Sequence, residues 1–141
     1  LMVSPETWRA FWKPAYARVY AAAHQAGMHA LLHSCGYIID ILPDLIEAGL
    51  DVIQIDQQEN MGIEALGRFA GRIAFWCPVD IQTVMCHGSA EEIRAYCRRL
   101  VRTFGTPACG FIPKWYGDPV GAGHAKEAID AMCSEFLRLT P

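Results

Sequence analysis

The feature that most constrains the fold is a regular alternation of helical stripes and short apolar segments. A helical stripe over residues 4–25 is followed by apolar segments at residues 28–34, 51–56, 72–77 and 109–114, and each segment precedes a further helical stretch. Strand–helix units of this length are typical of a parallel sheet with right-handed crossovers. We therefore predict an α/β fold with a leading helix and four strand–helix units. This is half of a (β/α)8 barrel or, alternatively, a small open sheet.

Local signals support the positions of two helices. Ser4 is a suitable N-cap with Pro5 at the first helical position, and Pro14 is expected to bend this helix without abolishing it. Ser89 and Glu92 have the spacing of a capping box at the start of the stripe over residues 89–104. These signals predict an interrupted first helix and a well-defined later one.

Length and charge narrow the class of protein. The 141 residues suit one domain spanning 1–141, and a net charge of −3 gives no electrostatic basis for nucleic-acid binding. No apolar run approaches the ~18 residues of a membrane span, so no membrane association is expected. The six cysteines form no compact framework and are expected to be reduced thiols in the cytoplasm. The start at Leu1 without an initiator Met favours a piece of a longer protein.

Polar and sulfur-containing side chains gather where the predicted strands end. The carboxyl ends of parallel strands meet at one edge, and ligands bind there in both candidate architectures. We therefore predict a site at this edge. In strand order, its candidate residues are His33, Cys35, Gln54, Asp56, Gln57, Cys77, Asp80, Lys114, Trp115, Tyr116 and Asp118.

The motif "HSCG" is the most specific part of this set. His33 and Cys35 are two residues apart and so point to the same side of an extended segment. They would form half of a zinc site, or they would be two small core residues. Structural alternatives also exist for other candidates: Cys77 as a buried small hydrophobe and Asp80 as a helix cap. Lys114 would equally be a solvated residue of the rim.

Longer stretches carry a family resemblance. Four stretches, taken in order, resemble the second half of the uroporphyrinogen decarboxylase superfamily. They are "SPETWRAFWKPAYARVYAAAHQAGMHALLHSCGYIIDILPDLIEAGLDVI", "RIAFWCPVDIQTVM", "GSAEEIRAYCRRLV" and "CGFIPKW". The resemblance implies a (β/α)8 barrel in which residues 1–141 form the C-terminal half, with the N-terminal strands missing. The superfamily also contains the zinc-dependent corrinoid methyltransferases.

The two branches of this superfamily differ at motifs that this chain contains or lacks. In the methyltransferases a His-x-Cys at a strand end ligates zinc, which implies that His33 and Cys35 are ligands here. The distal Cys of that branch is absent from "KWYGDP". Cys77 is the expected replacement, and Cys109, which opens the fourth predicted strand and should lie at the opposite end of the barrel, ranks below it. The decarboxylases use no metal and have a His after the last strand, which is absent after "GFIP". Of their "GNLDP" motif, only Asp80 survives in "CPVDI".

The expected function is therefore zinc-dependent methyl transfer. The cofactors are Zn²⁺ and a corrinoid carried by a partner protein, and the other reactant is a small methyl donor or a thiol acceptor. Asp56 and Asp80 are the expected catalytic residues, and Gln54, Lys114 and Tyr116 are expected to bind substrate.

Two alternatives from other classes stay open. One is uroporphyrinogen decarboxylase itself, a lyase of tetrapyrrole synthesis. The other is a non-catalytic fragment that covers its open sheet by forming a homodimer, because half a barrel exposes strand edges and an apolar interior. In that case the second copy would bury the inward-facing side chains of Leu31, Ile53 and Phe75.

Overall fold

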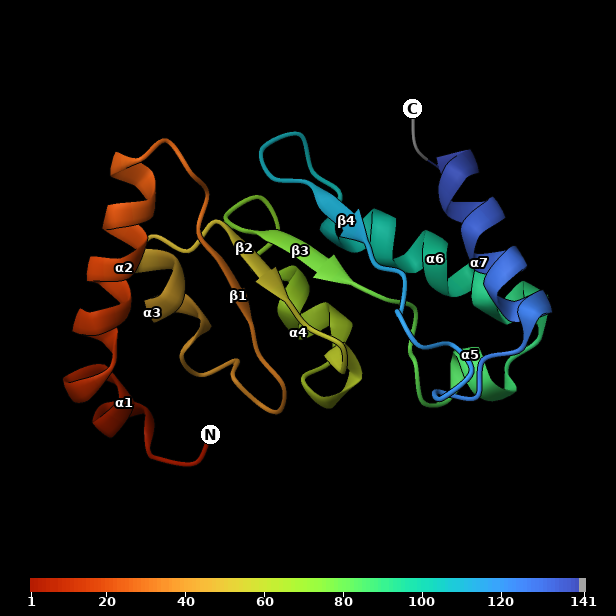
Figure 1. Cartoon of the computed structure of the whole chain (residues 1–141), viewed down its shortest axis with the longest axis horizontal. Coiled ribbons are helices and arrows are strands. Elements are labelled where there is room, and N and C mark those ends of the chain that lie inside the picture. The colour runs from red at the N-terminus through yellow and green to blue at the C-terminus, as the bar shows by residue number, and fades with distance from the viewer. Residues whose placement is uncertain (140–141) are drawn as a thin grey trace.

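Four short strands form one parallel sheet in the computed structural model, which describes residues 1–139. The sheet order β1-β2-β3-β4 follows the chain (Figure 1). The strands are β1 (Leu31–His33), β2 (Val52–Gln54), β3 (Ala74–Cys77) and β4 (Phe111–Pro113). In a (β/α) barrel, strands that follow one another in sequence lie side by side and run parallel, as they do here. The predicted α/β fold is confirmed.

Helices precede, separate and follow the strands. Figure 1 shows α2 and α3 beside β1 at one end of the molecule, and α6 and α7 toward the other end. No helix among residues 1–139 is both long and apolar enough to cross a membrane. The helices are α1 (Pro5–Phe11), α2 (Lys13–Gln25), α3 (Leu42–Glu47), η1 (Gln58–Asn60), α4 (Ile63–Gly67), α5 (Val84–His87), α6 (Ala90–Phe104) and α7 (Lys126–Leu139).

The predicted helix boundaries at Ser4 and Ser89 are confirmed. The Ser4 side chain accepts the Thr7 N–H, and Ser89 forms a reciprocal capping box with Glu92. The first helical stripe is divided at Trp12 into α1 and α2. This division follows from Pro14, which has no N–H to donate to the preceding turn.

The two faces of the sheet have opposite environments. Ile53 and Phe75 have no exposed surface, whereas Leu31 is 48% exposed and Ile112 is 42% exposed. Side chains alternate along a strand, and the register pairs Leu31 with Val52. The expectation that Ile53 and Phe75 share the inward face with Leu31 is therefore wrong. Both point to the helix-covered face, because each is one residue out of phase with the inward positions.

We call the open side of the sheet the inner face. The register places His33 beside Gln54, Gln54 beside Trp76, and Trp76 beside Ile112. The inner face is defined by Leu31, His33, Val52, Gln54, Ala74, Trp76 and Ile112. In a closed barrel this face would line the interior.

The core lies between the opposite face of the sheet and the helices. Phe75 of β3 stacks on Phe104 of α6 with ring centroids 4.2 Å apart. Phe111 of β4 continues this row to Phe136 of α7, at 5.9 Å. The aromatic row fixes α6 and α7 against the last two strands, and thereby fixes the loops that follow those strands.

Candidate functional site

A continuous row of polar contacts crosses the carboxyl ends of the strands. Cys35 Sγ lies 3.3 Å from His33 Nε2, and His33 Nδ1 contacts Gln54 Oε1. Gln54 Nε2 donates to Asp56 Oδ1 at 2.8 Å, and Lys114 Nζ donates to the same oxygen at 2.5 Å. We call Cys35, His33, Gln54, Asp56 and Lys114 the polar row. All five were predicted as site residues, and the fold brings them together.

Strand register explains how the first part of the row forms. His33 and Gln54 are direct partners in the parallel ladder, so their side chains leave the inner face side by side. Asp56 lies two residues beyond Gln54 and therefore points the same way. After Cys35 the chain turns at Gly36, whose φ of +79° is in the left-handed region that favours glycine. The turn leaves the Cys35 side chain exposed at the rim.

Lys114 completes the row from the far edge of the sheet. It follows β4 and has to cross β3 to reach Asp56 near β2. Its ammonium lies 6.0 Å from the ring centroid of Trp76 on β3 and 5.5 Å from that of Tyr116. Only 18% of the Lys114 side chain and 15% of the Asp56 side chain are exposed. The ion pair is thus largely removed from water, and the faces of two aromatic rings attract the ammonium group.

The pair of His33 and Cys35 fits part of a zinc site. Zinc bonds of about 2.3 Å to sulfur and 2.05 Å to nitrogen, at a tetrahedral angle, separate the two donor atoms by about 3.6 Å. The observed separation of Sγ and Nε2 is 3.3 Å, and the two side chains meet at the open rim. However, residues 1–139 contain no group of three or more His, Cys, Asp or Glu side chains that could hold a metal ion. The described residues supply two donors of the required type.

Cys77 does not supply a third donor, which corrects the expectation from sequence. It follows Trp76 directly on β3, so the two side chains point to opposite faces, and Cys77 lies on the helix-covered side. It has no exposed surface. Burial raises the pKa of the Cys77 thiol to about 12, so the thiol stays protonated at neutral pH.

The Asp80 carboxylate has local partners. Its oxygens accept the backbone N–H groups of Gln82, Thr83 and Val84 at 3.1–3.2 Å. These contacts shape the turn that leads into α5 and correspond to the capping alternative. The structure does not bring Asp80 into hydrogen-bond contact with the polar row.

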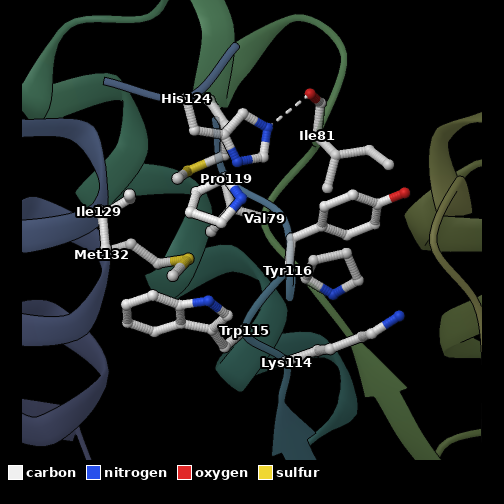
Figure 2. A pocket seen from close by; sticks show the side chains of 11 residues that line it. Val79, Ile81, Lys114, Trp115, Tyr116, Pro119, His124, Ile129 and Met132 are labelled. Atoms are coloured by element: carbon white, nitrogen blue, oxygen red, sulfur yellow. Dashed lines mark hydrogen bonds between the residues drawn. The ribbon is translucent and has the colours of Figure 1, made fainter. Parts of the chain in front are cut away.

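A small cavity lies between helix α7 and the loops that follow β3 and β4, and Lys114 of the polar row is one of its lining residues. Figure 2 shows Trp115 beside Met132, and the Lys114 side chain directed away from His124. The cavity measures about 10 Å³, which is room for about one water molecule. His124 is only 8% exposed and its Nε2 lies 2.9 Å from the Ile81 carbonyl oxygen. Nothing in the local sequence signals this burial, because the contact joins residues 43 positions apart.

More space is available beside His33. A cavity of about 130 Å³ is lined by Trp8, Tyr16, Leu32, His33 and Ser34, together with four further apolar residues: Leu1, Ile38, Ile41 and Leu45. The rings of Trp8 and Tyr16 are 5.7 Å apart and inclined at 36°. Both rings border a cavity next to the His33–Cys35 pair.

Comparison with known proteins identifies one family whose model covers the whole polar row. The family model described as "Uroporphyrinogen decarboxylase (URO-D)" matches residues 1–116, which include all four strands and every residue of the row. No curated protein and no solved structure gives a match. The matched part covers most of the 141 residues, and the parallel sheet agrees with the barrel fold of this family of enzymes. The chain belongs to the uroporphyrinogen decarboxylase family.

Proposed function

We propose that this chain is part of a zinc-dependent methyltransferase that exchanges a methyl group between a small molecule and a corrinoid carried by a partner protein. The observation that carries the proposal is the convergence of Cys35 Sγ and His33 Nε2, 3.3 Å apart, at the open rim. An imidazole nitrogen and a sulfur are donors that zinc prefers. Their separation is close to the one that tetrahedral coordination requires.

In this proposal His33 and Cys35 hold the zinc, and its remaining coordination positions are filled by water, by substrate or by other donors. Zinc bound there would lower the pKa of a coordinated substrate thiol. The other residues of the site position the metal ligand or select the substrate. Gln54 contacts His33, Lys114 and Tyr116 present a cation and a ring at the same rim, and the cavity beside Trp8 accepts a small apolar group.

The methyl transfer balances in either direction. When a thiol is the acceptor, it loses its proton to solvent and its sulfur forms a bond to the methyl carbon. The corrinoid of the partner protein would supply the methyl group and keep the electron pair of the broken cobalt–carbon bond, so that no external oxidant or reductant would be needed. When a small molecule is the donor, the reduced corrinoid would accept the methyl group, and the donor would leave with the electron pair of its broken bond.

The state of the cysteines favours a reducing compartment. All six are free thiols in the structure. Unpaired cysteines are usual where glutathione and thioredoxin keep thiols reduced. We therefore propose that the reaction takes place in the cytoplasm.

The decisive experiment measures zinc bound to the purified protein. We expect about one zinc per chain, lost in Cys35→Ser because a neutral hydroxyl is a poor ligand for this metal. His33→Ala should weaken binding. Cys109→Ser is the matched control, because Cys109 is a partly exposed thiol outside the polar row and its loss should leave the zinc content unchanged.

An activity assay separates the two branches of the family. With free methylcobalamin and a small thiol, the proposal predicts formation of the methyl thioether and release of Co(I), abolished by Cys35→Ser. Release of CO₂ from uroporphyrinogen, undiminished in Cys35→Ser and without zinc, would instead identify a decarboxylase. A wild-type protein that binds no zinc, or that keeps its zinc in Cys35→Ser, contradicts the proposal.

A further inference from the structure

The polar row has a fixed direction of hydrogen bonding that begins at Asp56. An ionised carboxylate only accepts hydrogen bonds. Asp56 Oδ1 accepts from Lys114 Nζ at 2.5 Å and from Gln54 Nε2 at 2.8 Å. Lys114 also supplies a countercharge to the Asp56 carboxylate, and only 15% of the Asp56 side chain is exposed.

The carboxylate determines which way the Gln54 amide is turned. The NH₂ group has to face Asp56, because the carbonyl oxygen of the amide would otherwise meet a second acceptor. The Gln54 carbonyl oxygen then faces His33. Gln54 is only 4% exposed, so water offers little competition for either end of the amide.

The amide in turn determines the tautomer of His33. An amide oxygen only accepts, so the His33 Nδ1 in contact with it has to carry the proton. In the neutral ring this leaves the lone pair on Nε2, the atom that lies 3.3 Å from Cys35 Sγ. Without such a partner, a neutral histidine in water carries its proton mainly on Nε2.

We propose that Gln54 and Asp56 are positioning residues that hold His33 in its Nδ1–H tautomer, with the Nε2 lone pair directed at Cys35. This deepens the proposed function, because a histidine that binds metal through Nε2 needs that nitrogen unprotonated. The tautomer itself does not depend on bound metal. It replaces the direct catalytic and substrate-binding roles expected for Asp56 and Gln54 from sequence.

The test uses the zinc-free protein with ¹⁵N-labelled histidine. Two-bond ¹H–¹⁵N spectra distinguish protonated from unprotonated ring nitrogens, and a His33→Gln variant identifies the His33 signals among those of the five histidines. All spectra are recorded at one mildly alkaline pH. We expect wild-type His33 to carry its proton on Nδ1.

Variants then test which residues set the tautomer. Gln54→Met and Asp56→Leu should convert His33 to a mixture in which the Nε2–H form is the larger fraction. Gln54→Glu should keep the Nδ1–H form, because a carboxylate still accepts from Nδ1. Gln57→Met is the matched control, since the Gln57 amide contacts Gln82 and lies outside the row. It should leave the tautomer unchanged.

The outcomes separate this inference from the proposed function. A wild-type His33 protonated on Nε2 overturns the inference without any variant, as does a tautomer that Gln54→Met leaves unchanged in a folded protein. If the wild type binds zinc, Gln54→Met should weaken binding about 10–100-fold, the usual effect of removing the group that orients a ligand. Failure to bind zinc would contradict the proposed function but leave the tautomer result standing.

Discussion

Lys114 Nζ lies 2.5 Å from Asp56 Oδ1, and this contact joins the ends of two strands that are not neighbours in the sheet. Lys114 follows β4 and Asp56 follows β2, while β3 between them presents the Trp76 ring beneath the lysine side chain. The contact therefore spans the open rim. It also fixes the orientation of Gln54, which donates to the same carboxylate oxygen.

Lys114→Met is expected to destabilise the protein, because it leaves a mostly buried carboxylate without its countercharge. The cost should be about 1–3 kcal/mol in the free energy of unfolding, measured by urea denaturation. Lys126→Met is the control: the Lys126–Asp130 pair has the same 2.5 Å separation, but its side chains are 81% and 60% exposed. Equal effects of the two substitutions would show that the Lys114 pair is no more protected from water than a surface pair.

Cys35 and Cys77 are expected to differ sharply in reactivity. Cys35 is exposed, whereas Cys77 is buried and burial raises the pKa of its thiol to about 12. Because the thiolate is the reactive form, iodoacetamide should alkylate Cys35 in the native protein and leave Cys77 unmodified until unfolding. Mass spectrometry of peptides after timed labelling measures both rates.

The same burial predicts the effect of Cys77→Ser on metal content. Zinc stoichiometry should equal that of the wild type, while stability falls because a hydroxyl replaces a packed sulfur in the core. Loss of zinc in a folded Cys77→Ser protein would restore Cys77 as a ligand. It would require a rearrangement of β3 that exposes the thiol at the rim.

Protonation of Asp44 in acid should weaken the contacts of α1 and α2 with α3, because Asp44 of α3 pairs with Arg9 of α1 and Lys13 of α2. Burial alone would raise the Asp44 pKa, but hydrogen bonds from Lys13 and Arg9, each 2.8 Å long, lower it below the ordinary 3.8. A lowered pKa means that the stabilisation is complete above pH 3.8 and is lost as the pH falls through the lower folded-state value.

Asp44→Asn should therefore reduce stability at neutral pH and flatten the loss of stability in acid. Unfolding free energies measured from pH 6 to 2 check this expectation. Glu47→Gln is the matched control, because Glu47 contacts the same lysine at 2.8 Å but its side chain is 74% exposed. If the unfolding free energy of Asp44→Asn falls as steeply in acid as that of the wild type, other carboxylates cause the acid sensitivity.

The chain of residues 1–141, expressed alone, is expected to self-associate. β1 and β4 are the edges of the sheet, and the inner face exposes Leu31 and Ile112 at 48% and 42%. Leu31→Lys with Ile112→Lys should reduce association, as measured by light scattering after size exclusion. Val19→Lys is the control, because Val19 is 66% exposed on α2, away from the inner face. A wild-type chain that is monomeric and unfolds cooperatively would count against the open half-barrel.

The sequence by itself determined the order of elements, the parallel sheet and the edge of the sheet at which the polar row lies. Amphipathic periodicity and caps act over a few residues, so Ser4, Ser89 and Glu92 could be recognised as helix signals without knowledge of the fold. Parallel strands bring their carboxyl ends to one edge. For this reason the residues of the polar row could be predicted before their contacts were known.

Only the tertiary structure decided which face each strand residue occupies and which rim residues meet. A strand three or four residues long carries too little pattern to fix its phase, and a shift of one residue exchanges Trp76 for Cys77 on the inner face. The Lys114–Asp56 contact joins positions 58 residues apart and depends on the reach of one side chain over β3. Such contacts are set by sheet register and helix packing, and for that reason the sequence placed Cys77 at the rim whereas the fold buries it.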